Sequence, residues 1–123
     1  MRKARTLSLF FLPALEARVT TAWQPLADVY RAREGWIVKM DLAGVRPQDI
    51  TIAVRGAQLR ISGVRHDWIV DEGWNHYAME IAYDRFERTI ELPCDLEHAG
   101  ITVECREGML LLRVAVKKES ENV

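Results

Sequence analysis

The chain has 123 residues, of which 49% are hydrophobic and 28% are charged, and its formal net charge is −1. This length suffices for one domain with its own hydrophobic core, and the balanced charge excludes a strongly basic nucleic-acid binder and an acidic disordered chain. No run of apolar residues approaches the roughly 20 that a membrane-spanning helix requires.

Residues 1–22 differ in composition from the rest of the chain. Basic residues outnumber acidic ones here, and a short apolar run extends from Leu7 to Leu15. A basic start before an apolar run is one mark of a secretory signal peptide, but Pro13 interrupts the run and no small-residue cleavage site follows before Trp23. We therefore expect an apolar arm that is exposed for binding or packed on the domain as a frayed helix, with export as the alternative.

From Trp23 onward, apolar and polar residues alternate in short runs that turn residues separate. A period of two is typical of β-strands with one buried face. The runs predict strands over residues 26–30, 36–42, 50–55, 59–61, 77–81, 86–92, 101–105 and 109–116, with one helical turn at Pro47. We therefore predict an all-β sandwich domain over residues 23–116 and a short polar tail over residues 117–123.

The stretch between Gly63 and Phe86 is long for a hairpin connection. Loops of such length in compact domains are usually functional or disordered. The apolar residues of this loop are too many for a solvated linker, and they are Trp68, Ile69, Val70, Trp74 and Tyr77. These side chains need a partner surface, which is either the chain's own sandwich or a second copy of the chain.

The expected strand from Phe86 to Leu92 places a cation among apolar residues. Every second residue gives Phe86, Arg88, Ile90 and Leu92, so the arginine falls on the apolar face. An unpaired buried charge costs several kcal/mol even after relaxation. We therefore expect Arg88 to be buried with an acceptor, and the alternative is a bulge that turns its side chain to solvent.

The sequence contains no pattern that is typical of catalysis or metal binding. Cys94 and Cys105 lack paired-ligand spacing, and the three histidines are scattered. There is also no phosphate-binding glycine loop and no nucleophile elbow. We predict that the protein is not an enzyme, uses no metal or other cofactor, and keeps its thiols reduced in a cytoplasmic location.

Four segments in order resemble the small heat-shock protein, or α-crystallin, family. They are residues 26–54 (LADVYRAREGWIVKMDLAGVRPQDITIAV), 59–65 (LRISGVR), 83–93 (YDRFERTIELP) and 101–114 (ITVECREGMLLLRV). The last three are similar to the family's "LTISGER", "YGSFERSFRLP" and closing hairpin. Ala43, Asp84, Val103 and the pair Ala115 and Val116 stand where the family has proline, glycine, alanine and Pro-Lys, so the chain is a divergent member.

The resemblance implies an immunoglobulin-like antiparallel β-sandwich, the α-crystallin domain. It also implies an ATP-independent holdase that binds partly unfolded proteins, its clients, through apolar surface and prevents their aggregation. The expected client-binding residues of the arm are Leu7, Leu9, Phe10, Phe11, Leu12 and Leu15. A groove between strands 50–54 and 101–105 offers a second patch, formed by Ile52, Val54 and Val103.

The resemblance also implies how copies assemble. In bacterial and plant members the long loop carries an extra strand that pairs with a second subunit, which predicts a homodimer by loop exchange. The same comparison places Glu80 as the partner of Arg88, with Asp41 and Asp28 as alternatives. Larger cages use an Ile-x-Ile or Ile-x-Val tail motif, whereas Val114 to Val116 continue the alternation of the last strand and are expected to be core residues.

The tail "KKESENV" therefore favours smaller homo-oligomers, or hetero-oligomers in which a sister protein supplies the motif. The competing interpretation is a dedicated interaction or assembly module with one fixed partner, of the α-crystallin or CS-domain type.

Overall fold

The computed structural model describes residues 9–11, 22–67 and 72–116. These residues form eight β-strands and one 3₁₀ turn. The strands are β1 (Leu9–Phe11), β2 (Ala27–Ala32), β3 (Gly35–Asp41), β4 (Ile50–Arg55), β5 (Gln58–Arg65), β6 (Asp84–Glu91), β7 (Gly100–Arg106) and β8 (Met109–Ala115). The turn, η1, covers Pro47–Asp49 and confirms the helical turn expected at Pro47.

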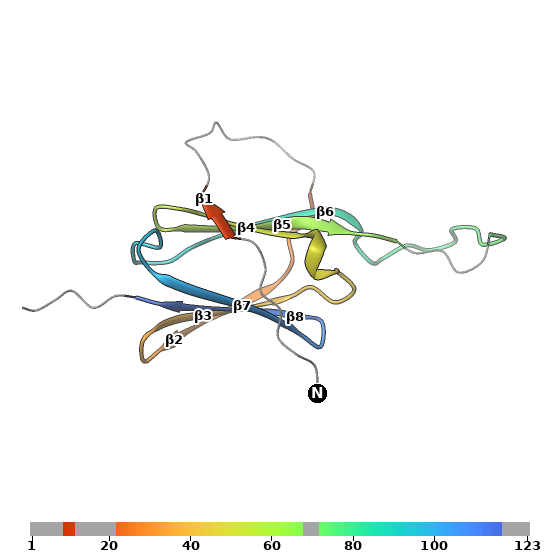
Figure 1. Ribbon diagram of the computed structural model, residues 1–123. Coiled ribbons are helices and arrows are strands. Elements are labelled where there is room, and N and C mark those ends of the chain that lie inside the picture. Colours follow the sequence, from red (N-terminus) through yellow and green to blue (C-terminus); the bar gives the residue numbers. More distant parts are fainter. Residues whose placement is uncertain (1–8, 12–21, 68–71, 117–123) are drawn as a thin grey trace, which may run out of the picture.

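The strands form two four-stranded sheets, in the orders β1-β4-β5-β6 and β2-β3-β8-β7. The two sheets lie face to face (Figure 1). All neighbouring strands are antiparallel except β1, which runs parallel to β4. The predicted all-β sandwich is confirmed.

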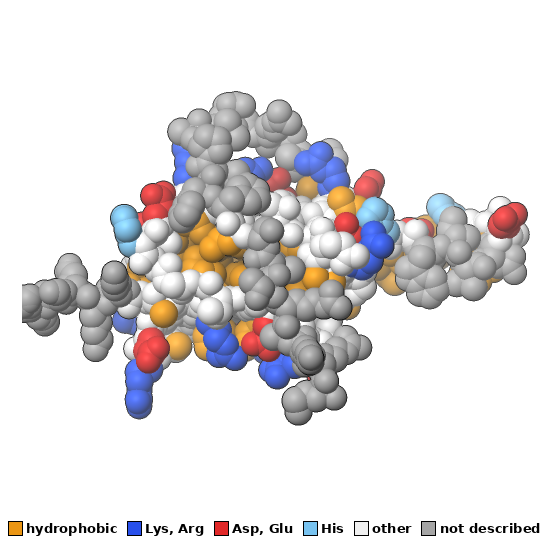
Figure 2. Space-filling view, viewed as in Figure 1, with side chains coloured by type: hydrophobic (Ala, Val, Ile, Leu, Met, Phe, Trp, Pro, Cys, Tyr) orange, Lys and Arg blue, Asp and Glu red, His pale blue; other side chains and the backbone are white. Residues whose placement is uncertain are grey.

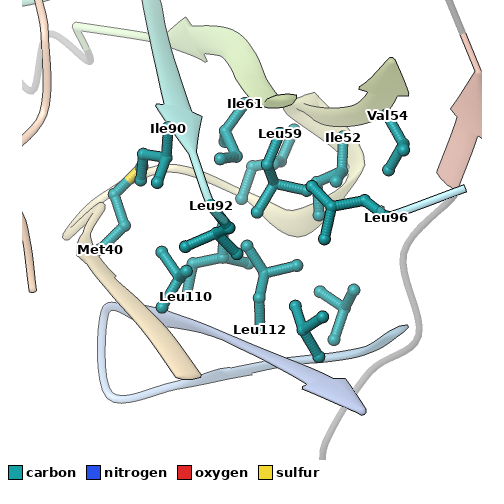
Figure 3. Packing of buried hydrophobic residues seen from close by; sticks show 14 of the residues in the cluster. Met40, Ile52, Val54, Leu59, Ile61, Ile90, Leu92, Leu96, Leu110 and Leu112 are labelled. Carbon is teal, nitrogen blue, oxygen red and sulfur yellow. The ribbon is translucent and has the colours of Figure 1, made fainter. Parts of the chain in front are cut away.

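The core consists of alternate residues from the inner faces of both sheets. Met40 of β3 and Leu110 and Leu112 of β8 meet Ile61 and the other apolar residues of the facing sheet, as Figure 3 shows, and Val38 of β3 belongs to the same cluster. Each of these five side chains is completely buried. Burial of one such side chain contributes about 1.5–3 kcal/mol to stability. The alternation in the sequence places these side chains on the inner faces, and their burial holds the two sheets together.

The expected strand over residues 77–81 is not formed, and this prediction was wrong for the protomer. Residues 72–83 contain no strand, while β5 extends to Arg65 and β6 begins at Asp84. The described parts of the loop extend away from the sandwich (Figure 1). A strand needs a neighbour for its backbone hydrogen bonds, and the protomer offers none at this distance from its sheets.

Close contacts around Gly63 explain why the middle of β5 contains a glycine. The residue pairs with Ile50 on one side and with Phe86 on the other. A Cβ atom added at Gly63 would overlap the carbonyl oxygen of Asp49 and lie 2.8 Å from Cζ of Phe86. The missing side chain therefore lets η1 and the Phe86 ring approach the sheet closely.

We expect Gly63→Ala to lower the free energy of unfolding by about 1–3 kcal/mol, because the added methyl group overpacks this contact. The matched control is Gly100→Ala in β7, where the new Cβ would lie 4.0 Å from Cβ of Ala115, an ordinary contact. Urea denaturation at one protomer concentration measures both variants. Equal stabilities of the two variants would contradict this account of Gly63.

Candidate functional site

The β2 strand is an edge of its sheet, and it carries exposed apolar side chains. It pairs only with β3 among the described strands. Val29 and Tyr30 of β2 are 43% and 44% exposed, and Leu26, directly before the strand, is 77% exposed. A row of unpaired backbone groups beside apolar side chains is suited to the addition of another strand.

Cation–π contacts hold the aromatic side chains of β2 and β3 in place. Nζ of Lys39 lies 5.3 Å from the centroid of the Tyr30 ring, and Cζ of Arg31 lies 5.1 Å from that of Trp36. A hydrogen bond with the Tyr30 side chain is the main reason that the pKa of Lys39 is raised. Lys39 is therefore positively charged at neutral pH, and it orients Tyr30 beside the open edge.

The long loop presents a second exposed apolar group. Trp74 is 61% exposed and Tyr77 is fully exposed, and Met79 and Ile81 are also exposed. Trp74 and Tyr77 therefore do not pack on the chain's own sandwich. Trp68, Ile69 and Val70, which were predicted to share this role, lie outside the described residues.

The expected groove residues belong to the core instead. Ile52 and Val54 are completely buried and Val103 is 9% exposed, so the prediction that they line an open groove is corrected. A pocket of about 570 Å³ lies nearby, and its lining includes Val45, Ile50, Cys105 and Met109. Figure 2 shows hydrophobic side chains along the seam between the two sheets.

Part of the N-terminal arm is described, and it forms strand β1. Leu9 pairs with Ile52 and Phe11 with Val54. Leu9 is half-buried and packs against the core, so it is already in contact with the sandwich. A frayed helix is excluded for residues 9–11. The side chains of Phe10 and Phe11, and the whole of Leu7, Leu12 and Leu15, lie outside the described part of the chain.

Arg88 lies on the inner face of β6, as the alternation predicted, but its acceptor differs from the expected one. Its side chain is half-buried, and Nη1 donates a hydrogen bond to the carbonyl oxygen of Pro25 at 2.7 Å. Glu80 is exposed and forms no ion pair with Arg88 in the protomer, and the same holds for Asp41 and Asp28. Because no strand forms at 77–81, nothing holds Glu80 beside the arginine.

Trp23 is a structural anchor that the sequence did not reveal. Its backbone accepts a hydrogen bond from Glu87 N–H and donates one to the Arg85 carbonyl, at 3.0 and 3.1 Å. Its indole Nε1 donates to the Asp84 carbonyl at 3.2 Å, and its ring centroid lies 5.4 Å from that of Phe86. Trp23 lies before the first predicted strand, which begins at Leu26, so no periodic signal marks it.

The other polar groups of the described chain offer no ligand set for a metal: no group of three or more histidine, cysteine, aspartate or glutamate side chains lies together there. Burial, followed by the charge of Asp95, raises the pKa of the Cys94 thiol. A hydrogen bond from His98, followed by one from the Glu97 backbone, lowers the pKa of Asp95. Among the described residues, no helix has the length and apolar character needed to span a membrane.

An antiparallel sandwich with an open edge strand and a projecting apolar loop defines an all-β domain suited to protein contacts. The chain belongs to the Hsp20/alpha crystallin family, whose model matches residues 28–123. The predicted family is therefore confirmed.

The chain is also similar to individual proteins in sequence and in structure. The chain is 29% identical over 98 residues to spore protein SP21 of Stigmatella aurantiaca and 24% identical over 97 residues to small heat shock protein C2 of Rickettsia felis. These matches cover 80% and 79% of the chain but only 58% and 63% of the two relatives. The crystal structure of hspA from Xanthomonas axonopodis superposes with a TM-score of 0.66 at 27% identity, covering 79% of this chain and 97% of that one.

We expect Arg88→Met to lower the free energy of unfolding by about 1–3 kcal/mol, because the Pro25 carbonyl loses its charged donor. Glu80→Gln is the matched control, and its effect should be close to zero since Glu80 is exposed. The double variant should then be additive within about 0.5 kcal/mol. Urea denaturation of the four proteins at one protomer concentration measures the coupling, and a clearly non-additive result would restore Glu80 as the partner.

Proposed function

We propose that the protein is an ATP-independent holdase chaperone, which binds partly unfolded proteins and prevents their aggregation. The observation that carries the proposal is the apolar arm from Leu7 to Leu15, of which strand β1 lies beside β4 of the sandwich. Family membership supports it, and relatives of the chain carry the name small heat shock protein.

Binding of this kind needs surface rather than reactive groups. A client that loses its fold exposes apolar area, and covering that area contributes roughly 25 cal/mol per Å². An adaptable apolar surface gains this energy without nucleotide or covalent chemistry. The arm residues from Leu7 to Leu15 are proposed as the main client-binding segment, because they are apolar and precede the domain.

We further propose a homodimer in which the loop of each copy pairs with β2 of the other. The loop supplies Trp74 and Tyr77, and β2 supplies an unpaired edge flanked by Leu26 and Tyr30. Mutual exchange would cover both apolar groups and give the loop the neighbouring strand that it lacks in the protomer. Larger homo- or hetero-oligomers would be built from this dimer. Cys94 and Cys105 form no disulfide with each other, which supports the proposed cytoplasmic location.

A dedicated module with one fixed partner is the second candidate, and one observation favours it. Val114 is 3% exposed within β8 and Val116 is half-buried against the core, whereas Ala115 between them is exposed. The Val-Ala-Val spacing therefore cannot serve as a detachable plug without opening the core. A chain that lacks this means of cage assembly would suit a small complex of fixed composition.

The holdase proposal predicts that the purified chain suppresses heat-induced aggregation of an unrelated model protein without nucleotide. Light scattering at near-stoichiometric ratios measures the effect. A variant that lacks residues 1–22 should keep its β-sheet circular dichroism and lose much of the suppression, because the apolar arm is gone. Absence of suppression by the full chain at a several-fold excess would favour the fixed-partner module, and equal suppression by the truncated chain would assign client binding to the sandwich.

The dimer proposal predicts that replacing both Trp74 and Tyr77 with serine raises the dimer dissociation constant by at least about tenfold, since buried aromatic rings dominate such contacts. The matched control replaces Asn75 and His76 with serine, which keeps the loop length and alters polar neighbours. Sedimentation velocity over a dilution series measures the constants. An unchanged constant for the aromatic variant would show that the dimer forms through another surface.

A further inference from the structure

We propose that Arg65 is a positioning residue that clamps the base of the long loop and thereby sets the direction in which the loop reaches a second copy. The inference rests on the proposed loop-exchanged dimer and names the residue that prepares the loop for it. Arg65 was not among the residues that the sequence singled out.

Arg65 stands where the loop leaves the sandwich. It is the last residue of β5 and pairs with Asp84, the first residue of β6. Residues 66–83 therefore begin and end at this one pair. Any interaction that fixes the pair also fixes the spacing and orientation of both limbs of the loop.

The guanidinium group of Arg65 joins three separate segments at this point. Nε donates to the carbonyl oxygen of Ala43 at 2.9 Å, and Nη1 donates to that of Ala82 at 2.8 Å. Cζ lies 4.4 Å from the centroid of the Trp23 ring. Ala82 belongs to the returning limb, whereas Ala43 and Trp23 belong to the body, so the arginine attaches the loop to the sandwich.

Two features show that this attachment determines the direction of the loop. Asp84 has a φ of 76°, which is uncommon for a residue other than glycine, and its carbonyl oxygen accepts the indole hydrogen bond of Trp23. On the departing limb, Nε2 of His66 lies 3.6 Å from Oδ2 of Asp49. Farther out, Trp74 and Tyr77 are exposed, so the contacts at the base orient the loop.

Arginine suits this role better than lysine does. The guanidinium is planar and presents several donors in a fixed fork, so one side chain can bond two carbonyls while its face lies on an aromatic ring. A lysine ammonium offers a single charged point on a flexible stem. A loop held at its base loses less conformational freedom when it binds, and this pre-organisation strengthens association without any new contact.

The test compares Arg65→Met and Arg65→Lys with the matched control Arg60→Met. Arg60 lies on the same strand and pairs with Glu87 of β6 through a salt bridge, away from the loop base. Sedimentation velocity gives the dimer dissociation constant, hydrogen exchange reports the amides of residues 72–84, and urea denaturation gives stability. These three measurements separate positioning of the loop from a general loss of fold.

We expect Arg65→Met to raise the dimer dissociation constant about tenfold through lost pre-organisation and to accelerate exchange at residues 72–84. Arg65→Lys should lie between Arg65→Met and the wild type, and Arg60→Met should change the constant less than about twofold. An Arg65→Met protein that dimerises as tightly as the wild type, with unchanged exchange, would overturn the role of Arg65 and leave the exchanged dimer standing.

Failure of the dimer itself gives a different result. If the serine replacements of Trp74 and Tyr77 leave the wild-type constant unchanged, the loop-exchanged dimer is wrong, and the proposed role of Arg65 in it is wrong too. If Arg65→Met does not fold, Arg65→Lys decides the question, because it keeps the charge and loses the fork. A wild-type constant for Arg65→Lys would then overturn the proposal.

Discussion

The hydrogen-bonding capacity of strand edges is the constraint on which this structure depends. Each sheet has two edges, and an unpaired row of N–H and C=O groups invites another strand. The chain covers β4 with β1 and part of β6 with the Trp23 segment. It protects β7 with charge, since Glu104 lies 3.8 Å from both Arg106 and Arg113. The β2 edge carries the exposed apolar residues Val29 and Tyr30 beside the charged Asp28 and Arg31, and it is the edge that the proposed loop exchange would use.

Arginines attach the irregular segments to the sheets. Arg88 binds the Pro25 carbonyl, and Arg65 binds the carbonyls of Ala43 and Ala82. All three acceptors lie outside strands, where backbone oxygens have no ladder partner. A charged donor satisfies them more strongly than a neutral one, and the half-buried position avoids most of the desolvation that a fully buried ion pair would require.

The direction of side chains within each strand could be predicted from the local alternation of residues. Contacts between segments that are far apart in the chain could not. Alternation placed Phe86 and Ile90 in the core and Arg88 on the inner face, because side-chain direction follows from strand geometry alone. It could not supply the acceptor of Arg88, which comes from a segment without periodicity. The strand expected at 77–81 is absent from the described part of the loop, since no strand of the protomer pairs with this segment. Ile52 and Val54 were assigned to an open groove because alternation identifies the inner face of a sheet but does not distinguish the edge of that face from its buried centre.

The arrangement of the edges also separates two kinds of binding. The β2 and β7 strands are opposite edges of one sheet, so a second copy bound to β2, as proposed, would leave the β7 edge uncovered. Residues of β4, β7 and β8 line the pocket beside Ile50 and Cys105, and β1 pairs with β4. If dimerisation covers Leu26 and Tyr30, these side chains are no longer available to clients. Under the proposed function, client capture would then fall to the arm and to the side of the sandwich away from β2, and a dimer would bind clients without competition between the two contacts.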